Sequence, residues 1–134
     1  MKHKLLIYQV LPRLFGNNKN TNTFNGTLKE NGCGKFEAFT TKALEEIKEL
    51  GMTHIWYTGV LEHATKTDYS NIGIRPDHPA VVKGNAGSPY AIKDYYDVCP
   101  DYAIDPNNRM NEFLELIQRI HNHNMKVIID LVPN

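Results

Sequence analysis

The sequence has 134 residues, of which 41% are hydrophobic, and its 15 Lys and Arg balance its 15 Asp and Glu. That length suits one modest domain, and the apolar content argues against wholesale disorder. The neutral charge balance argues against a nucleic-acid partner or an anionic membrane, since each calls for a basic excess.

No segment approaches the ~20 apolar residues that a membrane span needs. Gln9 interrupts the N-terminal apolar run after a few residues, so we expect neither a leader peptide nor a membrane partner. On this basis the cytoplasm is slightly favoured over the periplasm. Cys33 and Cys99 match neither a disulfide framework nor a metal motif, and both are expected to be free thiols.

The N-terminal region predicts a strand followed by a long loop. The apolar run from Leu5 to Val10 predicts a buried strand, which Pro12 closes. Residues 15–31 then form a polar, Asn-rich stretch, and Asn favours turns because it tolerates positive φ. A loop of this length in a compact domain is typical of a functional or mobile segment.

A helix is predicted from about Thr41 to Leu50. Its apolar stripe consists of Leu44, Ile47 and Leu50. Thr40 or Thr41 can cap its first turn, and Gly51 stands where a left-handed residue ends many helices.

A second strand is expected at 53–57, followed by a long irregular stretch from 58 to 105. A second helix is predicted at 108–123, with Asn124 at its C-terminal cap. Its apolar face comprises Met110, Phe113, Ile117 and Ile120. Strands separated by helices and short turns pair in parallel.

The last strand is predicted from Lys126 to Leu131, buried on both faces, with Asp130 near its C-terminal end. A carboxylate there is costly to bury without a partner. The long loops follow strands and the short turns follow helices, which favours an α/β barrel with its site at the C-terminal ends of the strands. A doubly wound sheet also fits, but no Gly-rich phosphate fingerprint is present.

Four stretches in this order resemble the α-amylase family of glycoside hydrolases (family 13). They are Ile7–Arg13, residues 39–56, Tyr90–Tyr95 followed by Asp105-Pro106, and residues 113–127 followed by Asp130–Asn134. The resemblance implies that residues 1–134 are the N-terminal part of one catalytic domain, with no second domain. It implies the first three β/α units of a (β/α)8 barrel, in the order β-α-β-α-β.

The resemblance also implies roles for individual residues. Tyr90 would stack on the sugar ring, Asp94 would fix its loop, and Asp130 would support the floor of the site. Asn134 would be a ligand of a structural calcium ion through its amide oxygen. The implied partners are an α-glucan or maltooligosaccharide and the remainder of the barrel.

In the family, a retaining mechanism uses carboxylates carried by later strands. None of these strands is in the sequence, so the 134 residues alone are expected to be inactive. Departures from the family pattern include Pro89 before the tyrosine, Gly59 after the second strand, and asparagines in place of an Asp-rich calcium loop. The last departure argues against metal binding in the loop after the first strand.

Two other functions remain open. The Tyr-rich loop could serve a non-catalytic carbohydrate-binding or scaffolding module, or the chain could belong to an unrelated α/β-barrel enzyme. For other polar residues we expect ordinary roles: Glu62 in solvent, His63 and His78 solvated or packed, and Trp56 in the core.

Overall fold

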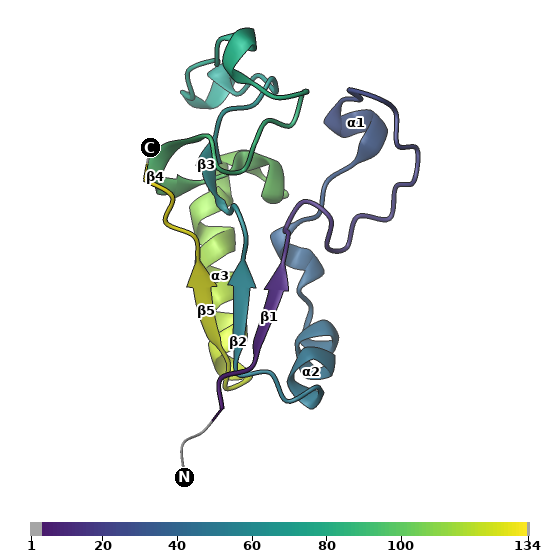
Figure 1. The fold of residues 1–134 in the computed structure, drawn as a ribbon, viewed down its shortest axis with the longest axis vertical. Coiled ribbons are helices and arrows are strands. Elements are labelled where there is room, and N and C mark those ends of the chain that lie inside the picture. The colour runs from purple at the N-terminus through teal and green to yellow at the C-terminus, as the bar shows by residue number, and fades with distance from the viewer. Residues whose placement is uncertain (1–3, 134) are drawn as a thin grey trace.

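The computed structural model describes residues 4–133 and contains two small sheets (Figure 1). The strands are β1 (Ile7–Val10), β2 (His54–Tyr57), β3 (Leu61–His63), β4 (Ile92–Val98) and β5 (Lys126–Ile129). The helices are α1 (Leu28–Asn31), α2 (Thr41–Glu49) and α3 (Arg109–Asn122).

The larger sheet has the order β1-β2-β5, and all its strands are parallel. Ile7 lies opposite His54, and His54 lies opposite Lys126, so the three strands begin level with one another. Helix α2 connects β1 to β2, and α3 leads into β5. This arrangement confirms the predicted parallel pairing of strands separated by helices.

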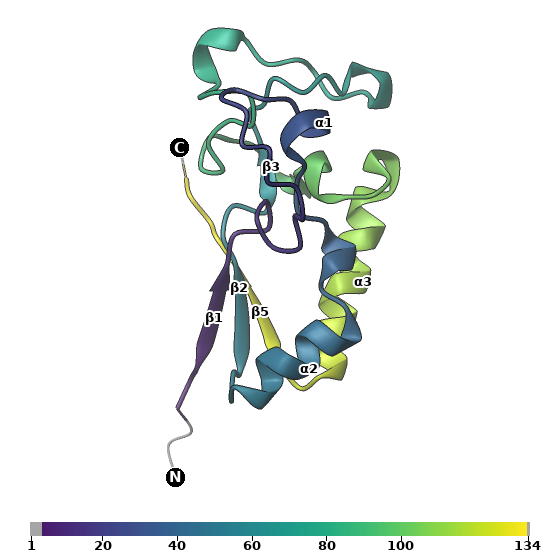
Figure 2. The ribbon, with the colours of Figure 1, turned by 90° about the vertical axis from the view of Figure 1, so that its right-hand side faces the viewer.

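Helices α2 and α3 lie on the same face of this sheet, as Figure 2 shows. Side chains alternate between the faces of a strand. The helix-covered face therefore carries Val10, Ile55 and Tyr57, which are all buried. These pack with Leu44 and Ile47 of α2, Phe113, Leu116 and Ile120 of α3, and Phe36, Phe39 and Tyr102 of the connecting segments.

The opposite face of the sheet has no helix over it, and we call it the open face. By alternation it carries Ile7, Gln9, His54, Trp56 and Ile128. The predictions of a buried first strand and of a last strand buried on both faces are wrong, since Ile7 is 46% exposed and Ile129 is 43% exposed. Both strands are edges of a sheet that is covered on one side only.

The ends of both helices follow the predicted chemistry. The Thr40 side chain accepts a hydrogen bond from the Ala43 amide, which confirms Thr40 as the cap of α2. Gly51 and Asn124 adopt positive φ angles of 85° and 54°. Leu50 is 64% exposed, so it does not extend the buried stripe of α2.

The apolar face of α3 is shifted from the predicted one. Leu116 is fully buried, whereas Met110 is 37% exposed. Phe113 and Ile120 are buried as predicted, and Ile117 is partly buried against the core.

Above the C-terminal ends of the parallel strands lies a layer of connecting segments, residues 11–35 and 58–106, which we call the loop layer (Figures 1 and 2). The prediction that 58–105 is irregular is wrong in part, because β3 and β4 form an antiparallel pair there. The predicted loop at 15–31 includes α1, whose first turn is closed by a reciprocal capping box between Thr27 and Glu30.

Within residues 4–133, no helix is both long enough and apolar enough to cross a membrane.

Candidate functional site

Asp130 lies just beyond the C-terminal end of β5, and the protein holds both of its carboxylate oxygens. The indole N–H of Trp56 donates to Oδ1, and the backbone N–H of Gly59 donates to Oδ2 at 2.9 Å. Trp56 projects onto the open face, so this arrangement places Asp130 on the same face. The prediction that Trp56 belongs to the core is wrong, because its ring N–H serves the carboxylate instead.

Two further hydrogen bonds order the surroundings of Asp130. The Gln9 side-chain amide donates to the Thr58 hydroxyl at 2.9 Å, joining the ends of β1 and β2. The Tyr95 hydroxyl donates to the Val132 carbonyl at 2.7 Å, so β4 is tied to the segment that follows Asp130. Polar groups from β1, β2, β4 and β5 thus meet at one end of the parallel sheet.

Tyr90 is placed near Asp130 by the packing of Pro89, the residue before it. Gly59 has a φ of 66°, and a Cβ atom added to it would lie 2.1 Å from the Cβ of Pro89. Pro89 therefore packs directly on the glycine whose amide binds Asp130. Tyr90 follows at once and is 46% exposed. The structure thus brings the predicted residues Tyr90 and Asp130 to the same end of the sheet.

Asp94 lies on β4 opposite Glu62 of β3. Its Oδ1 accepts a hydrogen bond from the Tyr96 amide at 2.7 Å, which makes it part of the local ordering of β4. Its predicted role at the substrate stays a prediction.

Glu62 is only 5% exposed, so the prediction of a solvated glutamate is wrong. Its carboxylate lies 3.6 Å from the Lys93 ammonium, which also lies 3.0 Å from Asp77. Burial raises the pKa of Glu62, and the attraction of Lys93 offsets only part of that rise.

His63 is buried against the core, as expected for a packing histidine, and burial lowers its pKa. His78 is exposed and caps a short 3-10 turn. Cys33 and Cys99 are both free thiols, as predicted.

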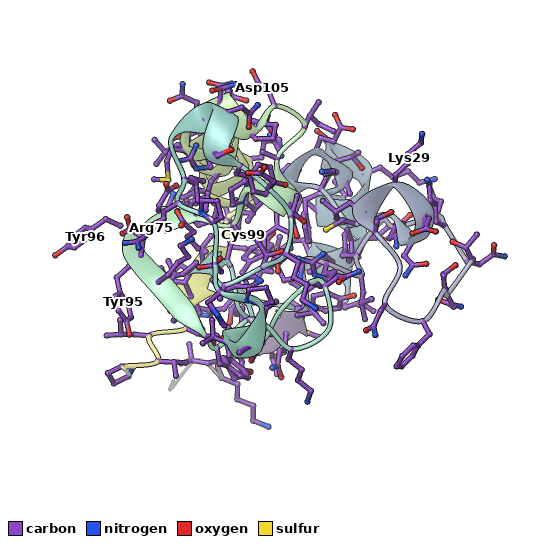
Figure 3. All side chains as sticks on the ribbon, turned by 90° about the horizontal axis from the view of Figure 1, so that it is seen from above. Lys29, Arg75, Tyr95, Tyr96, Cys99 and Asp105 are labelled. Carbon is purple, nitrogen blue, oxygen red and sulfur yellow. The ribbon has the colours of Figure 1, made fainter. Side chains whose placement is uncertain are left out.

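Figure 3 shows Tyr95 and Tyr96 of β4 at one side of the molecule, seen from above. Tyr96 is 93% exposed, although it sits in a strand. An exposed aromatic ring offers an apolar face of the kind that stacks on a pyranose. Successive side chains of a strand point to opposite faces, so the Tyr96 ring points away from that of Tyr95. Sequence reasoning singled out Tyr90 and assigned no separate role to Tyr95 or Tyr96.

The most buried carboxylate of the loop layer is Asp101, which sequence reasoning passed over. It is fully buried and accepts hydrogen bonds from the Arg13 guanidinium and from the Tyr69 hydroxyl. The Lys35 ammonium donates to the Asp101 carbonyl at 2.6 Å and to the Ala103 carbonyl at 2.9 Å. Burial lowers the pKa of Arg13, but attraction to Asp101 outweighs it and the pKa is raised. This network joins the two halves of the loop layer.

In the loop after β1, two asparagine side-chain oxygens already accept backbone hydrogen bonds. The amide oxygen of Asn17 accepts from the Lys19 amide, and that of Asn31 accepts from the Thr23 amide. Across residues 4–133, no cluster of three or more His, Cys, Asp or Glu side chains could hold a metal. The predicted ligand Asn134 lies outside the described residues, and its role stays a prediction.

Comparison with known proteins gives a consistent family. The profile described as "Alpha amylase, catalytic domain" matches residues 9–134. Pullulanase A of Streptococcus pneumoniae is 36% identical over 104 residues, which cover 75% of this chain. Oligo-1,6-glucosidase of Bacillus cereus is 27% identical over 129 residues, covering 96% of this chain. An α-amylase structure from Lactobacillus plantarum superposes with a TM-score of 0.63 at 28% identity, covering 97% of this chain.

The chain is much shorter than these relatives. It spans 8% of the pullulanase, 17% of the oligo-1,6-glucosidase and 22% of the α-amylase structure.

Proposed function

The chain belongs to the α-amylase family of glycoside hydrolases, and from that premise we propose that it forms the first three β/α units of a (β/α)8 barrel that acts on α-glucans. In such a barrel, β1, β2 and β5 of this chain are the first three strands, and the open face is the barrel interior. The remaining strands of the barrel are then its structural partner.

The observation that carries this proposal is Asp130. A carboxylate with both oxygens bound by fixed N–H donors, at the C-terminal end of a parallel strand and on the open face, occupies the position where barrel enzymes build their sites. Tyr90 and Tyr95 lie at the same end of the sheet. Together they offer hydrogen-bonding groups and aromatic faces, which suits a carbohydrate.

The geometry of Asp130 favours a positioning role over attack on the sugar. Both of its oxygens already accept hydrogen bonds from Trp56 and Gly59. It therefore fixes the Trp56 ring and the loop after β2, on which Pro89 and Tyr90 rest. In this proposal Tyr90 stacks on the sugar, and Asp94 keeps β4 in place beside it.

The chemistry itself requires groups beyond this sheet. A retaining glycosidase uses a nucleophile and an acid/base whose carboxyl groups lie about 5–5.5 Å apart. Among the open-face residues of β1, β2 and β5 and the residue that follows β5, Asp130 is the one carboxylate. We therefore expect the 134 residues by themselves to release no reducing sugar from starch or maltooligosaccharides. Measurable release by the pure chain would contradict this expectation.

The test of function uses the full-length protein and a panel of substrates: starch, pullulan, maltooligosaccharides and isomaltooligosaccharides. Release of reducing sugar from at least one α-glucan is the expected result. Binding of these sugars with no hydrolysis or transfer would instead favour a carbohydrate-binding module. If the protein neither binds nor turns over any of these sugars, the proposal is contradicted.

The role of the loop after β2 is tested by Gly59→Ala. A Cβ atom at this position meets Pro89, and its positive φ is strained for alanine. We expect the substitution to raise KM for the α-glucan, because the support of Tyr90 and the Gly59 hydrogen bond to Asp130 are both displaced. Gly73→Ala is the matched control, since Gly73 also has positive φ but no atom within 4 Å of the added Cβ.

A further inference from the structure

A cavity of about 530 Å³ opens in the loop layer, on the side of α1. It is lined by the segment after β1, from Arg13 to Gly32, and by Lys66, Thr67, Asn85, Ala86 and Asp101. Its volume lies within the range of small-molecule sites. None of the groups that hold Asp130 lines it, and Figure 3 shows Lys29 on the opposite side of the molecule from Tyr95 and Tyr96.

The charges around this cavity are unequal. Arg13, Lys29 and Lys66 supply three cationic groups, whereas Asp101 is the one carboxylate among the described residues that line it. The protein as a whole is neutral. A local excess of positive charge in a concave site focuses the field and attracts anions.

The Asp101 carboxylate is already paired with groups of the protein itself. One of its oxygens accepts from Arg13 and the other from the Tyr69 hydroxyl, and the side chain is fully buried. Glu30, the neighbour of Lys29, is held back by the Thr27 amide and hydroxyl in the capping box of α1. No carboxylate on the described lining therefore compensates the two lysines.

Lys29 and Lys66 belong to the two different segments that line the cavity. Both are exposed, and neither ammonium forms an ion pair with any residue between 4 and 133. Over the same residues, the Arg13 guanidinium makes its hydrogen bond through Nη2 to Asp101. The two lysine ammonium groups, which have no ion-pair partner among these residues, are suited to a ligand that brings its own negative charge.

The walls are held in place before any ligand arrives. The Asn17 amide donates to the Asn31 carbonyl at 2.9 Å, and the Asn31 amide donates to the Thr23 carbonyl at 2.8 Å. The Asn85 amide donates to the Asn25 carbonyl and so ties the two walls together. Such preorganisation lowers the entropic cost of binding.

We propose that this cavity binds a phosphoryl group, carried by a sugar phosphate or as inorganic phosphate, between Lys29 and Lys66 over the Arg13–Asp101 pair. Phosphate oxygens accept strong charge-assisted hydrogen bonds from Lys and Arg. The amide and hydroxyl groups of the lining, such as those of Asn22 and Thr67, provide hydrogen-bonding partners for sugar hydroxyls. This inference does not depend on the proposed hydrolase activity.

Isothermal titration of the full-length protein with glucose 6-phosphate, inorganic phosphate and glucose tests the proposal. We expect glucose 6-phosphate to bind most tightly, because the cavity has room for the sugar as well. We expect Lys29→Gln and Lys66→Gln each to weaken binding about fivefold, and the double variant about 20-fold. Added salt should weaken binding further.

The matched control is Lys42→Gln with Lys48→Gln, two exposed lysines of α2 that are remote from the cavity lining. The control pair should leave the affinity within about twofold of the wild type. Equal affinity for inorganic phosphate and glucose 6-phosphate would support the site and identify free phosphate as its ligand. No binding up to about 10 mM, equal binding of glucose, or equal losses in the control pair would overturn the proposal.

Discussion

The helix-covered face of the sheet and the loop layer are stabilised by different interactions. Between the sheet, α2 and α3, the contacts are apolar, and side chains such as Ile55 and Leu116 are completely buried. The loop layer also contributes apolar side chains such as Val98 and Tyr102 to this core, but it adds ion pairs that are buried or half-buried. These join Arg13 to Asp101, Lys93 to Glu62 and Asp77, and Asp97 to Arg109 of α3.

This difference matches the expected division of labour. Apolar burial is non-directional and supports a stable platform. Buried ion pairs have strict geometry, and losing one partner leaves an uncompensated charge. The loop layer is therefore well suited to hold side chains in fixed positions, and it should be more sensitive to single polar substitutions and to pH.

The largest effect is expected from Asp101→Asn in the loop layer. Arg13 and Tyr69 donate to different oxygens of Asp101, so an amide places an NH₂ group opposite one of them and removes the negative charge that pairs with Arg13. We expect a loss of about 3 kcal/mol or more in the free energy of unfolding. Hydrogen exchange should show lost protection in β3 and β4 before β2. Uniform loss in both sheets would show that the two regions are not separable.

Leu116→Ala tests the apolar region. Leu116 of α3 is fully buried against the core, so its truncation leaves a cavity. This cavity should lower the free energy of unfolding by about 3 kcal/mol. Denaturant unfolding measures this cost. It should be insensitive to salt, because no charge is removed. A strong salt dependence for Leu116→Ala would contradict the division between the regions.

A smaller and opposite effect is expected from Tyr57→Phe. Tyr57 belongs to the helix-covered face, and its hydroxyl is buried with no hydrogen-bond partner among the described residues. Burial also raises its pKa, so the group stays neutral. Removing the unsatisfied hydroxyl should stabilise the fold by about 1 kcal/mol. A loss of stability by thermal unfolding would indicate that the hydroxyl has a partner in solution.

The smallest effect concerns the pH dependence of the loop layer. The pKa of Glu62 is raised by burial, so the folded protein holds this proton more tightly than the unfolded chain does. The stability that the proton contributes is present below the unfolded pKa of about 4.3 and is lost as the pH rises through the raised folded value.

Glu62→Gln removes the group that ionises, so the variant does not lose this stability as the pH rises. The variant should gain stability relative to the wild type at pH 8, and the gain should shrink towards pH 4. Melting temperatures at both pH values measure it. A gain that grows as the pH falls would mean that the folded pKa is lowered instead.

Sequence reasoning predicted the platform better than the loop layer. Helices α2 and α3 follow from apolar periodicity, and their ends follow from Thr40, Gly51 and Asn124, because these signals are local. The strands β3 and β4 were missed because Lys93, Asp94 and Asp97 are poor strand formers, and their pairing depends on contacts distant in sequence.

The candidate site shows the same limit. Asp130 could be predicted because it is a carboxylate that directly follows an apolar run. Its donors, Trp56 and the amide of Gly59, are 74 and 71 residues away in sequence and could not be identified from local patterns. The burial of Glu62 likewise depends on the cross-strand position of β4.

The central claim is that Asp130 organises the sugar site, and the kinetics of Asp130→Asn in the full-length protein test it most directly. An asparagine can accept from only one of Trp56 and Gly59, so its NH₂ group would face the other donor. We expect kcat/KM on the preferred α-glucan to fall at least about 100-fold with the fold intact. In the control Asp68→Asn, the side-chain oxygen can still accept from the Ser70 amide, so the variant should match the wild type. Near-normal activity of a folded Asp130→Asn variant would contradict the account.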